Sequence, residues 1–235
     1  MKKILGGLFG LVVLAGIGFY LLVANIDGIV KNVVETVGTE VTGTRVRLAS
    51  VEIDLQSGKG SLKGLTIANP EGFAKGDAFS LAEITLGLDV GTLSKSPVVI
   101  NQIIVDGATV NYLGQGNKSN LQTILDNLKS GGSDSGSGSG GSGGDDTLII
   151  IDEFRFTDAN MTIAMEGVPE LNKNVVISDV ISKDIGRKAG GVTPAEAATE
   201  IMQPIVERAV RQGINAVSDG GLDKAMDKVK GIFGK

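Results

Sequence analysis

The side chains that could perform catalysis are limited to carboxylates, lysines, arginines and isolated serines, because the chain contains no histidine and no cysteine. The commonest general base and metal ligand is therefore missing, and with it Ser-His triads and histidine-bearing zinc sites. Thiol nucleophiles and disulfides are excluded as well. Adjacent carboxylates such as Asp152 and Glu153 lie in a predicted strand, where consecutive side chains point to opposite faces and cannot act on one bond. We therefore expect no catalytic residues and a protein that is not an enzyme.

The segment Gly58-Lys59-Gly60-Ser61 superficially resembles a phosphate-binding loop. A Walker A motif requires a glycine five residues before its Gly-Lys pair and Ser or Thr directly after the lysine. Ile53 and Gly60 occupy those two places. The segment therefore predicts a hairpin turn and no cofactor site.

Metal and nucleic-acid binding are not expected either. Asp134, Asp145 and Asp146 lack the spacing of calcium-binding loops, so no metal site is predicted. The net charge of −5 and the pI near 4.9 oppose binding to a phosphate backbone. The sequence thus favours partners other than nucleic acid.

The most apolar stretch, residues 4–26, contains no charged residue and follows Lys2 and Lys3. As a helix it would measure roughly 34 Å, enough to cross a hydrocarbon core of about 30 Å. A cleaved signal would have a shorter apolar region, so an uncleaved anchor is favoured. The basic residues place the N-terminus in the cytoplasm of a bacterium and the rest of the chain in the periplasm, beside the inner membrane. Gly6 and Gly10 form a GxxxG motif that could pack membrane helices together.

The segment after the anchor predicts an amphipathic helix, because apolar residues recur every three or four positions from Ile26 to Val41. Its apolar stripe could pack on the following domain or rest on the membrane surface. Packing is favoured, since the polar face carries too little basic charge for an interfacial helix.

From Arg45 onward the apolar period changes to two, which predicts β-strands. A phase slip at Ala49 and Ser50 suits a β-bulge within one long strand. Asp106-Gly107 predicts a hairpin, and Asp158 predicts another turn. The pattern favours a twisted antiparallel meander of about eight strands, which could be shaped as a groove.

Two further features divide the chain. The Gly/Ser-rich segment 130–146 predicts a flexible linker. Segment 193–235 predicts amphipathic helices that could cover the sheet, bind another protein or touch the membrane. The fold class is α+β, with these expected parts: anchor 1–26, connecting helix 27–43, first β-rich part 44–129, linker 130–146, second β-rich part 147–182, and C-terminal helices 193–235.

Alternating strands give the sheet one apolar face that could contact lipid. Ordinary core packing beneath the C-terminal helices is the competing interpretation of this face, and the residue pattern alone favours it. The predicted face comprises Val46, Leu48, Ile53, Leu55, Ile84, Leu86, Leu88 and Val90.

Several motifs together resemble the periplasmic repeats of the AsmA-like family. They are Val51–Leu55 with Gly58–Gly60, Leu65–Phe73 containing Asn-Pro-Glu-Gly, Ala82–Ile84, and Ile103–Ala108. The resemblance implies a small single-pass inner-membrane protein with a periplasmic antiparallel sheet and an apolar groove related to lipid transfer proteins. It supplies no catalytic residues.

Two functional hypotheses follow. The first is a non-enzymatic protein of envelope biogenesis or lipid handling, which binds phospholipid through the apolar face. The second is an accessory subunit or scaffold that binds another envelope protein or copies of itself. A third interpretation is a small β-sandwich of the desiccation-protein type, whose strands also contain Asn-Pro breaks.

Overall fold

The computed structural model describes residues 26–116, 118–131, 147–166 and 172–233, with side chains up to residue 216. Among these residues no helix is both long and apolar enough to cross a membrane. Residues 4–25 of the predicted anchor, with Gly6 and Gly10, lie outside the described residues, as does 132–146 of the predicted linker.

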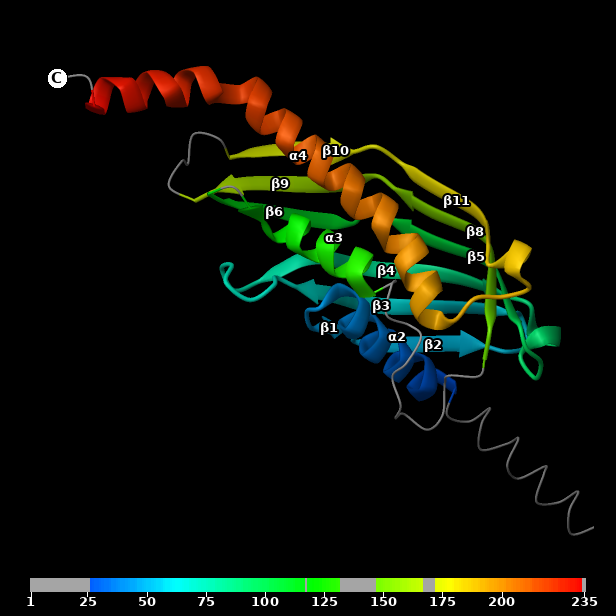
Figure 1. Ribbon diagram of the computed structural model, residues 1–235. Coiled ribbons are helices and arrows are strands. Elements are labelled where there is room, and N and C mark those ends of the chain that lie inside the picture. The colour runs from blue at the N-terminus through cyan, green and yellow to red at the C-terminus, as the bar shows by residue number, and fades with distance from the viewer. Residues whose placement is uncertain (1–25, 117, 132–146, 167–171, 234–235) are drawn as a thin grey trace, which may run out of the picture.

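The molecule is an α+β fold in which three helices lie on one face of a single sheet (Figure 1). The helices are α2 (Ile26–Thr42), α3 (Asn120–Gly131) and α4 (Pro194–Phe233). The strands are β1 (Val46–Arg47), β2 (Ser50–Asp54), β3 (Lys59–Ala68), β4 (Asp77–Leu88), β5 (Val98–Asp106), β6 (Thr109–Gln115), β7 (Lys118–Ser119), β8 (Ile149–Thr157), β9 (Ala159–Met165), β10 (Lys173–Ile177) and β11 (Val180–Ile185). Two 3₁₀ turns, η1 (Val90–Thr92) and η3 (Arg187–Ala189), lie beside the sheet. A single sheet is not the two-sheet arrangement that the β-sandwich interpretation requires.

The strands are mostly antiparallel, but the expected pure meander is wrong. β5 pairs in parallel with β8, and β6 pairs in parallel with β9. Between the two members of each pair the chain passes through β7, α3 and residues 132–148. A parallel pair requires such a long crossover, so the Gly/Ser-rich segment belongs to a crossover connection.

The predicted hairpin at Asp106-Gly107 is also wrong. β5 and β6 do not pair with each other; both pair with β4 in one register, which joins Ile84 to Val105 and Ser80 to Thr109. They are two halves of one long strand. Gly107 has φ +69°, a conformation that glycine adopts without steric cost, and here the strand kinks and continues rather than reversing.

The same arrangement recurs in three other strand pairs. β8 and β9 continue in one register along β5 and β6, with Asp158 at φ +51° between them, so the predicted turn there is a kink in a continuing strand. β10 and β11 likewise continue along β9 and β8. β1 and β2 both pair with β3 in one register, which joins Val46 to Ile67 and Ser50 to Lys63; the predicted break in alternation at Ala49 and Ser50 is present, but the β-bulge is wrong because no residue is inserted.

These kinks line up across the sheet and form what we call the crease. In each of the six long strands, two consecutive residues separate the buried or partly buried side chains that face the helices. The crease comprises Ala49–Ser50, Lys63–Gly64, Ala82–Glu83, Asp106–Gly107, Thr157–Asp158 and Ser178–Asp179. The alternation of inward and outward side chains changes phase there on every strand while the register stays the same, and the sheet bends at this line.

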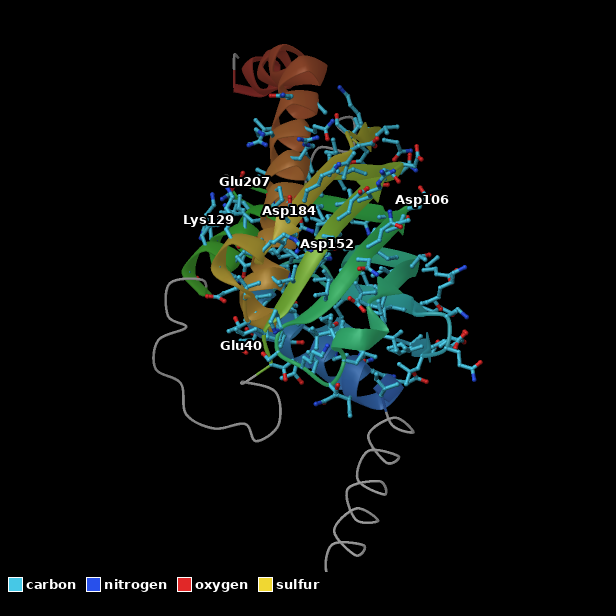
Figure 2. All side chains as sticks on the ribbon, turned by 90° about the vertical axis from the view of Figure 1, so that its right-hand side faces the viewer. Glu40, Asp106, Lys129, Asp152, Asp184 and Glu207 are labelled. Atoms are coloured by element: carbon cyan, nitrogen blue, oxygen red, sulfur yellow. The ribbon has the colours of Figure 1, made fainter. Side chains whose placement is uncertain are left out.

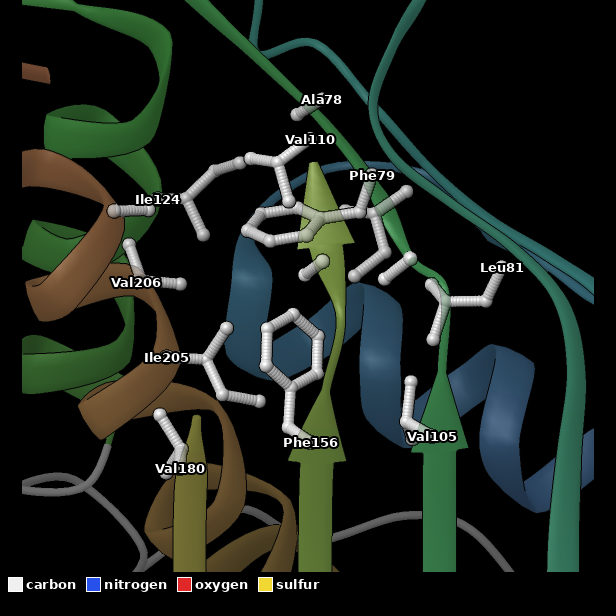
Figure 3. Packing of buried hydrophobic residues seen from close by; sticks show 14 of the residues in the cluster. Ala78, Phe79, Leu81, Val105, Val110, Ile124, Phe156, Val180, Ile205 and Val206 are labelled. Atoms are coloured by element: carbon white, nitrogen blue, oxygen red, sulfur yellow. The ribbon is translucent and has the colours of Figure 1, made fainter. Parts of the chain in front are cut away.

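The hydrophobic core fills the space between the bent sheet and the three helices. Phe79 and Phe156 meet Val206 and Ile205 of α4 there (Figure 3), and all four side chains are at most 3% exposed. α2 contributes Val41, with further valines packed against the core, as its predicted apolar stripe requires.

The starts of α3 and α4 carry side-chain caps. The Ser119 hydroxyl accepts the Gln122 N–H at 3.1 Å. Thr193 and Glu196 form a reciprocal capping box, with Oγ1 accepting the Glu196 N–H at 3.2 Å and Oε2 accepting the Thr193 N–H at 2.8 Å. The expected separate C-terminal helices are one continuous helix, α4.

Candidate binding surfaces

The predicted lipid-contacting residues do not gather on one open surface. Val46, Leu48, Ile84 and Leu86 are at most 7% exposed and belong to the core. Ile53 is half-buried against that core. The remaining three residues lie toward one end of the sheet: Leu55 and Leu88 are half-buried, and Val90 is 39% exposed.

The three helices α2, α3 and α4 cover one face of the sheet, which we call the inner face (Figure 1). Ile124 and Leu128 of α3 and Val206 and Ala209 of α4 are fully buried against it. α4 crosses over the sheet diagonally, while α2 lies along β1 and β2 (Figure 1). Described residues of α4 up to 216 therefore cover the sheet, one of the three roles that the sequence left open.

An acidic concavity of about 470 Å³ lies at the end of the sheet where α2 begins. Its carboxylates include Asp27 of α2, Asp54 of β2 and Glu83 of β4, with Lys59 beside them. The pKa of Asp54 is lowered because the Ser57 hydroxyl, at 2.7 Å, and neighbouring backbone N–H groups donate to its carboxylate. Asp54 thus serves the β2–β3 turn that the sequence predicted.

A second concavity, of about 350 Å³, lies at the other side of the sheet between β11, η3 and the first turns of α4. Lys183, Asp184, Lys188 and Glu200 are its charged lining residues. Two positive and two negative side chains balance here, so the concavity favours no particular ion.

Asp152 and Glu153 both face away from the helices, contrary to the expectation of opposite faces. Ile151 and Phe154 on either side are the buried residues, so the alternation of side chains changes phase between them while the register with β11 stays the same. Arg187 pairs with Asp152 and with Asp184, and this raises the pKa of Arg187. Figure 2 labels the two aspartates. Within the described residues no three acidic side chains are grouped so as to hold a metal ion.

The free edge of β1 and β2 is closed by polar side chains of α2. Asp27, Glu35 and Thr39 accept the backbone N–H groups of Ile53, Leu48 and Val46, at 3.1, 2.8 and 3.0 Å. Lys31 donates to the Ala49 carbonyl at 3.1 Å.

The four α2 residues Asp27, Lys31, Glu35 and Thr39 follow one another at intervals of four, which aligns them on one side of the helix. We call them the edge clamp. They hydrogen-bond to the edge strand as a neighbouring strand would. They therefore occupy the backbone groups that another chain would need for pairing.

The opposite edge, formed by β10 and β11, is only partly covered. Arg208 of α4 donates to the carbonyls of Ser178 and Asp179, and Gln212 donates to the Val176 carbonyl at 3.2 Å. The side chains of Val176 and Ile181 are 63% and 55% exposed. This edge combines unpaired strand backbone with exposed apolar side chains, the usual composition of a strand-docking site.

A buried polar network holds the loop after β3, and no sequence pattern predicts the residue at its centre. Asn120 is fully buried; its Oδ1 accepts the Leu113 and Leu121 N–H groups, both at 2.8 Å. Its Nδ2 donates to Asn69 Oδ1 at 2.8 Å and to the Asn111 carbonyl at 2.7 Å. Every polar atom of this amide is satisfied, so the network is structural rather than a ligand site.

No protein-family model, curated protein or solved structure matches this chain. The resemblance to the AsmA-like family stays a prediction that depends on the motifs themselves.

Proposed function

We propose that this chain is a membrane-anchored, non-enzymatic module of the bacterial envelope that works by binding protein, as an accessory subunit or scaffold. The observation that carries the proposal is the covered inner face. Four of the eight residues predicted to contact lipid are core residues beneath α2, α3 and α4, so the apolar surface stabilises this fold. Partners are left with the outer face and the edges.

The experiment is native mass spectrometry of the full chain, extracted in a mild detergent and exchanged into a second one. We expect a protein complex that retains no phospholipid in fixed ratio. A monomer that retains one or more phospholipids through the exchange would overturn the proposal in favour of lipid handling.

Lipid handling is the second candidate, and one observation favours it. Leu55, Leu88 and Val90 remain partly accessible at the end of the sheet, and Ile29 in the first turns of α2 is 44% exposed. Asp27 bonds to Ile53 at this end, so these residues lie beside the segment that follows the predicted anchor.

An environment-sensitive dye on Val90→Cys would test membrane contact at this end, because the natural chain has no other cysteine. In the full chain reconstituted into phospholipid nanodiscs, a blue-shifted emission at this position would support lipid contact. Thr85→Cys on the outer face of β4 is the matched control. Equal, water-like emission from both positions would contradict lipid contact here.

A further inference from the structure

We propose that the β10–β11 edge pairs with the same edge of a second copy of this chain, in antiparallel register across a two-fold axis. The inference deepens the proposed scaffold function by naming the partner. It depends on four features of the edge: the direction of its backbone groups, its symmetry, its side chains and the closure of the opposite edge.

The backbone groups of Val176 point to the open side. Asn160 of β9 donates its N–H toward β6, and backbone groups alternate along a strand, so Ala159 faces β10. Its partner there is Ile177. The neighbouring Val176 must therefore face outward, and the hydrogen bond from Gln212 to its carbonyl agrees.

Ile181 is oriented in the same way. The Gly107 N–H donates to the Thr157 carbonyl, so Thr157 faces β5 and Phe156 faces β11. Phe156 is paired with Val180. Ile181, the next residue, directs its N–H and carbonyl to the open edge.

One register satisfies both halves of the edge. With Val176 of one copy opposite Ile181 of the second copy, two residues with outward backbone groups and exposed side chains face each other, twice per dimer. The crease residues Ser178 and Asp179 then lie opposite each other, so inward and outward side chains stay in phase on both sides. Shifting the register by two residues would place an outward residue against an inward one at the crease.

The side chains of this edge are self-complementary in that register. Val176 and Ile181 form an apolar cross-strand pair, a type of pair that stabilises antiparallel sheets. Lys183 faces Asn174, so no like charges oppose each other.

Pairing requires little rearrangement of α4. Gln212 would release the Val176 carbonyl to the incoming Ile181 N–H. Within the described residues the Oε1 atom of Gln212 is the buried side-chain atom that lacks a hydrogen-bond partner, so its present position is incompletely satisfied. The backbone of α4 also continues past β10 (Figure 1), so a second copy meets a helix as well as a strand.

The closed opposite edge limits the assembly to two copies. The edge clamp on α2 occupies the groups that a further strand would need. Identical surfaces related by a two-fold axis form a closed pair rather than a filament.

The test uses the cysteine-free background of the full chain in membranes. Two single-cysteine proteins, Val176→Cys and Ile181→Cys, carry tags of different size and are produced separately and together. In a hydrogen-bonded antiparallel pair the opposed Cα atoms are about 5.5 Å apart, within the roughly 4.4–6.8 Å that a disulfide spans. We expect a disulfide heterodimer when the two are mixed under oxidising conditions.

Each protein alone provides the register control. Two copies of residue 176 would lie about five residues apart along the strands, roughly 17 Å, which is too far for a disulfide. Adding Asn174→Pro to both proteins should reduce the mixed cross-link at least tenfold, since proline removes an edge N–H donor. Circular dichroism checks that these variants fold.

Cross-linking of Val176→Cys with itself, or no cross-link in the mixture, would overturn the proposed pairing. If native mass spectrometry still finds a complex with a different protein, the scaffold function stands and only the identity of the partner is wrong. If it finds a monomer with phospholipid, both are wrong.

Discussion

The β1–β2 edge and the β10–β11 edge present the same kind of backbone, but the helices meet them differently. At β1–β2 the edge clamp covers three N–H groups and one carbonyl with four side chains spaced along α2. At β10–β11, Arg208 and Gln212 reach carbonyls near the crease, and two apolar side chains stay exposed. A helix parallel to an edge strand can close it completely, whereas a helix that crosses it closes only the crossing point.

Removing the edge clamp should have the largest effect on stability. In Glu35→Ala/Thr39→Ala the N–H groups of Leu48 and Val46 lose their acceptors, at an expected cost of about 2–3 kcal/mol. Urea unfolding followed by circular dichroism measures it. Glu40→Ala, an exposed position on the same helix, should change stability by less than about 0.5 kcal/mol. Equal effects of the two changes would show that the clamp does not stabilise the edge.

Substitution of a crease glycine beside the clamped edge should cost more stability than substitution of a crease glycine in the middle of the sheet. Gly64 and Gly107 both have positive φ. A Cβ on Gly64 would lie 2.8 Å from the Ala49 Cβ, whereas a Cβ on Gly107 would have no neighbouring atom within 4 Å. We expect Gly107→Ala to cost about 1 kcal/mol and Gly64→Ala about 2 kcal/mol.

A double-mutant cycle with Ala49→Gly separates strain from contact. This substitution should recover the additional cost of Gly64→Ala and leave Gly107→Ala unchanged. Equal unfolding free energies for the two alanine variants would contradict the close approach at the clamped edge.

The β10–β11 edge should respond more weakly than the β1–β2 edge. Arg208→Met keeps the aliphatic stem and loses the donors to Ser178 and Asp179, whose carbonyls are accessible to water at the exposed crease. We expect a loss below about 1 kcal/mol in chemical unfolding. A loss as large as that of the clamp variant would mean that the two edges are closed equally well.

The smallest effect concerns Glu207 of α4, which pairs with Lys129 of α3. The pKa of Glu207 is lowered, first by the Gln203 amide and then by Lys129 and Arg211 (Figure 2). A carboxyl with a lowered folded pKa stabilises the fold above its unfolded pKa, and this contribution disappears as the pH falls through the folded pKa. Glu207→Gln should therefore cost about 0.5 kcal/mol at pH 7 and nothing at pH 2, measured by thermal unfolding. An equal cost at both pH values would contradict an ionic origin.

Local signals predict the helices and one break in strand alternation well. Ser119 and Thr193 cap their helices through side chains that lie within three residues of the groups they bind. The slip at Ala49 and Ser50 was visible because apolar and polar residues alternate clearly on both sides of it. These features depend on neighbours in the sequence, so the sequence contains them.

The turns predicted at Asp106-Gly107 and Asp158 are wrong because a tight turn and a kink in a continuing strand use the same residues. Both place a residue at positive φ, and only the partner strand decides whether the chain reverses or continues. That partner is β4 for the first and β5–β6 for the second. Neither Asp106-Gly107 nor Asp158 indicates which distant segment will be the partner strand.

The edge clamp was missed although a signal for it existed. Asp27, Lys31 and Glu35 lie on the polar face of the predicted amphipathic helix, and their interval of four aligns them in a row. An edge strand for the row to meet became apparent only in the folded sheet. The burial of Val46 and Leu48 beneath helices depends on tertiary packing in the same way.

The position of α4 sets the order in which the molecule can fold. Ala197, Ile205, Val206 and Ala209 are buried core residues, yet they follow all eleven described strands in the sequence. The inner face of the bent sheet therefore stays uncovered until α4 has been synthesised. A chain truncated before α4 would expose the same apolar face to aggregation and to chaperones.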